Sequence, residues 1–228
     1  MSNLVGKIKQ RGYWHVVFHP AQFGERLVPR IQDLHAIIRE AAVEFRGWDF
    51  PHLSREGPTT GVDWIEDEVD WSEYVETWRL YQSGQFVFYG GIRTDWLDQS
   101  LFERPSDNWR HGLLLAVTDT VFRFTEVFEL AARLASGPID GDTLRLGVKI
   151  VGLDQRELWM DKRRSLGFHY PRKAAIAEFP QTFALPRDRL VAETRQLAVT
   201  AAGELFARFS WTPESEFLTV MQGELFRR

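Results

Sequence analysis

The sequence contains no cysteine and no long apolar run, and each absence excludes a class of protein. Without cysteine, the 228-residue chain has no disulfide, no thiolate metal ligand and no cysteine nucleophile. Because no stretch approaches about 18 uninterrupted apolar residues, we expect no membrane-spanning helix. Residues 1–10 also lack the apolar segment of a secretory signal. These features predict a soluble, cytoplasmic protein.

Contiguous motifs of catalysis and cofactor binding are also missing. The chain has no Gly-rich phosphate loop, no dinucleotide-binding fingerprint, no His-Glu-x-x-His pair and no Gly-x-Ser-x-Gly elbow. We therefore expect no cofactor and assign no catalytic residue. Because an active site can also be assembled from scattered residues, the sequence favours a non-catalytic role and leaves enzymatic activity open.

Two histidines, His15 and His19, are four positions apart, a spacing at which two ligands on a helix can share a metal ion. The residues around them are aromatic and β-branched, which predicts a strand. At roughly 3.3 Å per residue, four positions separate their backbones by about 13 Å. A zinc ion needs each nitrogen at about 2.0–2.1 Å, so the pair predicts no shared metal.

The overall composition is that of a globular protein, with 44% hydrophobic and 26% charged residues and a net charge of −4. Since the chain is not basic, any contact with nucleic acid must come from a local patch. Aromatic residues are abundant, at 14%, and include nine tryptophans. They indicate an aromatic core, with an interface as the alternative.

The hydrophobic periodicity predicts an α+β fold with a mainly antiparallel sheet of about five strands and packed helices. We expect strands at residues 13–18, 74–81, 85–93, 143–151 and 174–183, and helices at 23–45, 109–134, 188–209 and 213–226. We expect residues 1–228 to form one domain. Two sub-halves that divide near Pro138 are the alternative.

An acidic segment lies between residues 63 and 76 and has no Lys or Arg within it. A solvated loop that leads into a strand is one interpretation of this segment. The second is a docking surface for a basic partner, anchored by Trp64 and Trp71, and the third is a divalent metal site. Its acidic residues are Asp63, Glu66, Asp67, Glu68, Asp70, Glu73 and Glu76.

A basic segment at residues 156–173 has aromatic residues between its charges. A solvated loop is again one interpretation. The others are contact with phosphate, nucleotide or nucleic acid, and pairing with the acidic segment of this chain or of a neighbour. The basic residues are Arg156, Lys162, Arg163, Arg164, Arg172 and Lys173.

The strongest local signal is a hairpin, in which residues 82–84 separate two predicted strands and Gly84 can adopt the φ > 0 that a tight turn needs. A purely structural role is one interpretation of the hairpin. The other is a ligand or partner site to which Arg79, Tyr81, Ser83 and Gln85 contribute.

The same hairpin carries a family resemblance. Residues 78–87 read WRLYQSGQFV and are followed by Asp95 and Trp96, while residues 46–51 read RGWDFP. Over about residues 12–96 the chain resembles the accessory region found downstream of Schlafen-like AlbA_2 domains in bacterial regulators and defence proteins. The AlbA_2 domain itself has no counterpart here. The resemblance implies a sensing or interaction module of a bacterial regulatory or antiviral defence complex.

Three functions follow as hypotheses. The first is a non-catalytic sensor or protein-interaction subunit that binds another protein, with self-association left open. The second is a nucleic-acid or nucleotide-binding module that uses residues 156–173. The third is a hydrolase with a dispersed carboxylate site formed by Glu66, Asp67 and Asp70.

Overall fold

One seven-stranded antiparallel sheet organises the computed structural model, which describes residues 3–22, 24, 26–98, 109–139, 141–160 and 167–227. The strand order is β2-β3-β4-β5-β1-β7-β9. The strands are β1 (Tyr13–Pro20), β2 (Thr59–Thr60), β3 (Trp64–Trp71), β4 (Tyr74–Tyr81), β5 (Phe86–Gly91), β7 (Thr143–Val151) and β9 (Glu178–Pro186). The predicted α+β class with a mainly antiparallel sheet is confirmed, with seven strands in place of about five.

The first strand in the sequence lies inside the sheet. β1 pairs with β5 on one side and with β7 on the other, both antiparallel. Its side chains alternate, so that Trp14, Val16 and Phe18 are buried on one face while their neighbours point to the other. The alternation read from residues 143–151 is confirmed in the same way, since the even-numbered residues of β7 are the buried ones.

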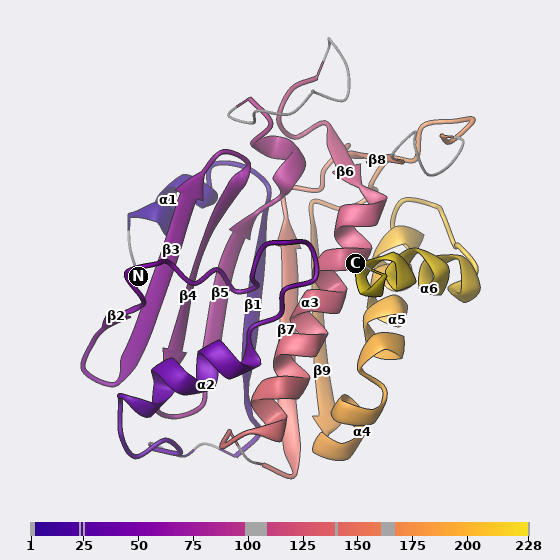
Figure 1. The fold of residues 1–228 in the computed structure, drawn as a ribbon. Helices are drawn as coiled ribbons and strands as arrows, with labels where there is room; N and C mark the ends of the chain where they lie inside the picture. The colour runs from indigo at the N-terminus through magenta and orange to yellow at the C-terminus, as the bar shows by residue number, and fades with distance from the viewer. Residues whose placement is uncertain are drawn as a thin grey trace.

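Helices cover one face of the sheet, and one short helix touches the other (Figure 1). The central helix α3 (Val117–Ser136) packs on the buried face of β1, where the ring centroids of Phe124 and Trp14 are 5.1 Å apart. Beside it lie α2 (Asp33–Ala41), α4 (Arg187–Ala192), α5 (Thr194–Ala207) and α6 (Ser215–Gly223). The short α1 (Leu4–Ile8) packs against Val75 and Trp96 on the opposite side.

Smaller elements complete the fold. β6 (Leu114–Ala116) and β8 (Glu157–Trp159) form a two-stranded parallel pair near the start of α3 (Figure 1). The 3-10 helices are η1 (Arg93–Asp95) and η2 (Glu224–Phe226). Within the described residues, no helix is both long and apolar enough to cross a membrane.

Several predicted boundaries are wrong, and tertiary contacts explain two of the differences. The acidic segment predicted as a loop contains β3, because its odd-numbered residues from Ile65 to Trp71 face the covered side of the sheet. The helix expected at residues 23–45 is confined to α2, since Gln82 donates to the carbonyls of Val28 and Pro29 ahead of it. The helix expected at 109–134 begins only at Val117, after β6.

Candidate functional site

A cluster of charged side chains is buried between the sheet and its helices. Arg46, from the segment between α2 and β2, donates to Glu126 of α3 at 2.7 Å through Nε and through Nη2, and it also pairs with Asp119. Arg123 of the same helix lies 3.5 Å from Glu76 of β4. Glu76 and Glu126 are each 2% exposed. Each buried carboxylate therefore has a guanidinium partner, without which burial of its charge would be strongly destabilising.

The geometry explains the directions in which pKa values shift in this cluster. Burial lowers the pKa of Arg46, but the charges of Glu126 and Asp119 outweigh that effect and raise it. Burial raises the pKa of Asp119, but neighbouring guanidinium groups, Arg46 foremost, bring it below its usual value. Burial raises the pKa of Glu76 despite the opposing charge of Arg123. Glu76 therefore takes up a proton more readily than Asp119.

Four aromatic rings stack beside the charged cluster. The ring of Trp48 lies 4.3 Å from that of His52 and 4.5 Å from that of Tyr74, and Trp71 lies nearly parallel at 5.8 Å. His52 is hydrogen-bonded to Asp49 at 2.9 Å, and this bond, more than any other interaction, raises the pKa of His52. The stack fixes the segment between α2 and β2 against the edge of the sheet.

Several acidic residues of β3, and Glu73 in the turn before β4, are engaged inside the chain. Glu66 pairs with Arg79 at 2.5 Å, and Asp67 accepts a hydrogen bond from the backbone N–H of Ser54 at 2.8 Å. The further pairs are Lys7–Asp70 at 2.6 Å and Arg93–Glu73 at 2.8 Å. The proposed carboxylate trio of Glu66, Asp67 and Asp70 is thus divided among separate partners.

The predicted anchors Trp64 and Trp71 project from opposite faces of β3. Trp64 is the register partner of Tyr81, and Trp71 that of Tyr74, in a regular ladder where the side chains alternate. Trp64 lies half-buried under Arg79, while Trp71 is 55% exposed. They cannot anchor one partner surface together. Across the described ranges, no group of three or more His, Asp or Glu side chains is placed to hold a metal ion.

The basic segment does not form a single surface among the residues that the structure describes. Arg156 is 1% exposed and makes a bidentate pair with Asp95, at 2.6 and 2.8 Å. Arg172 donates to the carbonyl of Ser210, and Lys173 pairs with Glu157 at 3.3 Å. Arg163 and Arg164 lie outside the described residues, so the predicted phosphate contact at these two positions stays a prediction. Among the described residues, the basic segment does not pair with the acidic one.

The Arg156–Asp95 pair connects distant parts of the chain. Asp95 also accepts hydrogen bonds from the backbone N–H groups of Gly12 and Gly112, at 2.8 and 2.9 Å. Arg156 donates in addition to the carbonyl of Leu114. A Cβ on Gly12 would collide with both members of the pair. Arg156 is therefore part of the internal framework at the start of β1, and it is not available to a ligand.

The side of the sheet away from α3 differs in character, and we call its surface on β4, β5, β1 and β7 the open face. Among the described residues, α1 packs on it at one corner together with Trp96, and Val75, Thr77 and Val87 are buried on this side. Its side chains are the odd-numbered residues of these four strands, which are mainly Tyr, His, Val, Thr, Arg and Lys. None of them is Asp or Glu. The acids that project to this side belong to β3 and β9.

Four of these residues form what we call the basic strip, His15 and His19 of β1 with Arg145 and Lys149 of β7. His19 is the register partner of Arg145, and His15 that of Lys149. Between the two pairs lies Gly147, where an added Cβ would meet nothing closer than 3.8 Å. Burial, followed by the charges of Lys9 and Lys149, lowers the pKa of His15. The strip is thus cationic through Arg145 and Lys149 at neutral pH, and flat between them.

The second feature of this side is the hairpin end, which we define as Trp64, Arg79, Tyr81, Ser83, Gln85 and His19. The guanidinium group of Arg79 lies 3.9 Å from the centroid of the Trp64 ring and 5.8 Å from that of Tyr81. Ser83 and Gln85, in the turn after β4, line a cavity of about 200 Å³ together with His19, Pro20, Ala21 and Gln22. Gly84 in this turn has φ +80°, as the sequence predicts.

The structure therefore brings together five predicted binding residues, Trp64, Arg79, Tyr81, Ser83 and Gln85, at one end of the sheet. It places Trp71, Arg172 and Lys173 elsewhere. The sequence reasoning missed His19, Gln22, Arg145 and Lys149, although alternation in residues 13–20 and 143–151 marks the exposed positions of both strands. What it could not show is that β1 and β7 are neighbours.

Comparison of the chain with models of known protein families, with curated proteins and with solved structures finds no match. The resemblance to the accessory regions downstream of AlbA_2 domains stays a prediction.

Proposed function

We propose that this protein is a non-catalytic interaction module that binds its partner on the open face of the sheet. The observation that carries the proposal is the asymmetry of the sheet, since helices cover one face while, among the described residues, α1 and Trp96 pack at one corner of the other (Figure 1). A sheet face that displays tyrosine, histidine and cationic side chains at register positions is a surface suited to recognition.

The interaction role is supported by the way the ionisable groups are used. The buried carboxylates on the covered side pair with arginines, and Asp95 pairs with Arg156. Each of these contacts holds one segment of the chain to another. The resemblance to accessory regions of bacterial regulators and defence proteins points to the same kind of role. Both partner classes expected from the sequence, another protein subunit and nucleic acid, require a surface of this type.

The test compares two valine-to-glutamate variants of the tagged protein, purified from cells that produce it naturally. Val17→Glu places a charge in the middle of the open face, between the register partners Val87 and Gly147. Val220→Glu is the matched control, because Val220 lies on α6 and is 57% exposed. We expect the wild type and Val220→Glu to retain the same bound component, and Val17→Glu to lose it.

Mass spectrometry and nucleic-acid staining of the purified material identify the component. A wild-type protein that carries no component would contradict the proposal. So would a component retained equally by all three proteins, because its binding would not depend on the open face. Circular dichroism of each variant must show that the fold is intact.

A further inference from the structure

We propose that the open face binds single-stranded nucleic acid, with an unpaired base at the hairpin end and backbone phosphates on the basic strip. This inference rests on the proposed function and deepens it, since it names the chemical class of the partner. It also moves the expected nucleic-acid contact away from residues 156–173 to a surface built from β1, β4, β5 and β7.

The charge distribution on the open face suits a polyanion. Arg145 is exposed and forms no ion pair with the described residues, and Lys149 pairs only with Glu178 at the neighbouring edge strand, at 2.7 Å. Both members of that pair are 40% or more exposed, so water weakens it and a phosphate can compete for the lysine. At the α1 corner, Lys9 lies 4.9 Å from the centroid of the Tyr89 ring and adds another cation. This surface therefore carries cationic groups although the net charge of the chain is −4.

Rings on the same face offer stacking partners for bases. His15 stacks on Tyr89 with 4.4 Å between ring centroids and an angle of 14° between their planes. The lowered pKa of His15 keeps its ring largely uncharged at neutral pH. At the hairpin end, the guanidinium group of Arg79 lies over the Trp64 ring, 3.9 Å from its centroid. Aromatic and guanidinium planes are the surfaces on which proteins bind unpaired bases.

The cavity at the hairpin end supplies the groups that read a base edge. Ser83, Gln85 and Gln22 carry a hydroxyl and two amides, which both donate and accept hydrogen bonds. The Nδ1 atom of His19 is hydrogen-bonded to the carbonyl of Pro20 at 2.6 Å, which leaves Nε2 for a ligand. None of the described residues that line this cavity carries a fixed charge, as expected for a pocket that receives a neutral base.

The spacing of these features favours a chain over a free nucleotide. The pairs His19–Arg145 and His15–Lys149 are four positions apart along their strands, a distance of about 13 Å. A single nucleotide at the cavity would leave the far pair without an anion. A duplex would hide its base edges from the cavity, whereas a single strand exposes them. The flat surface at Gly147 lets a backbone pass between the two cationic pairs.

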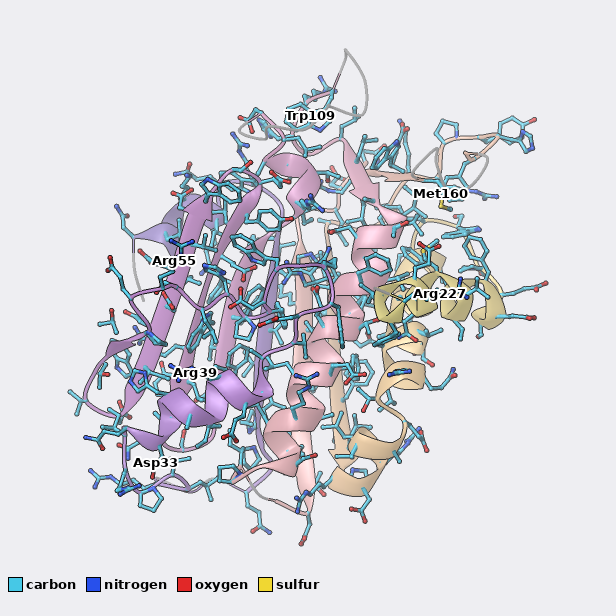
Figure 2. All side chains as sticks on the ribbon, viewed as in Figure 1. Asp33, Arg39, Arg55, Trp109, Met160 and Arg227 are labelled. Atoms are coloured by element: carbon cyan, nitrogen blue, oxygen red, sulfur yellow. The ribbon has the colours of Figure 1, made fainter. Side chains whose placement is uncertain are left out.

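The experiment measures binding of fluorescein-labelled single-stranded RNA and DNA of mixed sequence, and of the matching duplexes, by fluorescence anisotropy. The test variant is Arg145→Glu/Lys149→Glu. The control is Arg39→Glu/Arg55→Glu, which changes the net charge equally at two exposed positions, on α2 and on the segment between α2 and β2 (Figure 2). Measurements at about 50 mM and about 200 mM salt separate phosphate contacts from other contacts.

We expect single strands to bind more tightly than duplexes, and the test variant to lose at least tenfold in affinity. The control should lose less than threefold. The variant Gln85→Leu should weaken binding without changing its salt dependence, because it removes a contact to a base. Thermal melts of each variant verify that the fold is retained.

Absence of binding to single strands at low salt would overturn this inference, and so would equal losses in the test and control variants. The proposed function fails separately. If the purified protein binds no oligonucleotide but holds a protein component that Val17→Glu releases, the open face is still the contact surface and only the partner class is wrong. If Val17→Glu releases nothing, the proposed function fails with it.

Discussion

The two faces of the sheet share one backbone, yet they use charged residues in opposite ways. On the covered side, Arg46 and Arg123 are 14% and 12% exposed and pair with carboxylates of α3 and β4. On the open face, Arg145 is exposed and Lys149 has a single, exposed partner. Charge on the covered side stabilises the fold, because removing one partner leaves a buried ion without its main counter-charge. Charge on the second side contributes little to stability and is free for recognition.

The largest effect expected from this difference is the loss of Arg46. In Arg46→Met, the buried Glu126 loses its main partner and keeps Arg123 at 3.6 Å, while Asp119 loses its nearest cation and keeps Arg93 at 4.0 Å. Removing one partner of a buried ion pair lowers the free energy of unfolding by about 3–5 kcal/mol. Urea denaturation followed by circular dichroism measures this loss. The matched variant Arg145→Met on the open face should change stability by less than about 0.5 kcal/mol. A loss below about 1 kcal/mol for Arg46→Met would contradict the claim that the charges of the covered side stabilise the fold.

A smaller effect is expected for two histidines, whose contributions to the free energy of unfolding change with pH in opposite directions. The pKa of His52, beside the covered side, is raised above its ordinary value of 6.5 by its bond to Asp49. Its contribution to stability is therefore complete below pH 6.5 and is lost as the pH rises through the folded-state pKa. The pKa of His15, on the open face, is lowered by burial and by lysine charges. Its contribution is present above pH 6.5 and is lost as the pH falls through the folded-state pKa.

Titration of the imidazole signals by NMR checks both directions. We expect the His52 signal to titrate above 6.5 and the His15 signal below it. Lys149→Glu should raise the pKa of His15, since it replaces a repelling charge with an attracting one, and should leave that of His52 unchanged. In denaturation series, His52→Gln should cost more stability at pH 6 than at pH 8, by no more than about 1 kcal/mol because His52 is only half-buried. The opposite order would contradict the assignment.

A small stability effect should also come from the variant designed to abolish binding. Arg145→Glu/Lys149→Glu replaces the exposed pair of Lys149 with Glu178 by two exposed like charges, so the free energy of unfolding should fall by about 1 kcal/mol. Differential scanning calorimetry of this variant and of Arg39→Glu/Arg55→Glu measures the difference. If the open-face variant lost several kcal/mol, its charges would be structural and the contrast between the two faces would disappear.

The sequence predicts the fold class and the hairpin well because both depend on local patterns. Alternation gives β1 and β7, and the flexibility of Gly84 gives the turn. The strand at residues 64–71 is not predicted from the sequence, because the acidic side chains of this segment indicate a solvated loop. In the structure, Asp67 is only 9% exposed, and its carboxylate accepts a hydrogen bond from the backbone N–H of Ser54 in the preceding loop. That partner is distant in the sequence, and no local pattern reveals it.

The candidate site shows the same limit. Arg79, Tyr81, Ser83 and Gln85 could be proposed because they are adjacent in one hairpin. His19 and Arg145 join them only through the pairing of β1 with its two neighbours. The role of Arg156 was misread for a related reason. Its position in a basic segment suggested a surface, whereas its burial depends on Asp95 and on glycines elsewhere in the chain.

The interior position of β1 has a consequence for biosynthesis. This strand leaves the ribosome before the other strands of the sheet, and its hydrogen-bonding partners β5 and β7 end at Gly91 and Val151. Until those segments emerge, the apolar face of Trp14, Val16 and Phe18 has no native strand beside it. Contacts across such long sequence separations slow folding and prolong the exposure of apolar surface to aggregation. The nascent chain should therefore depend on chaperones most between the emergence of β1 and that of β7.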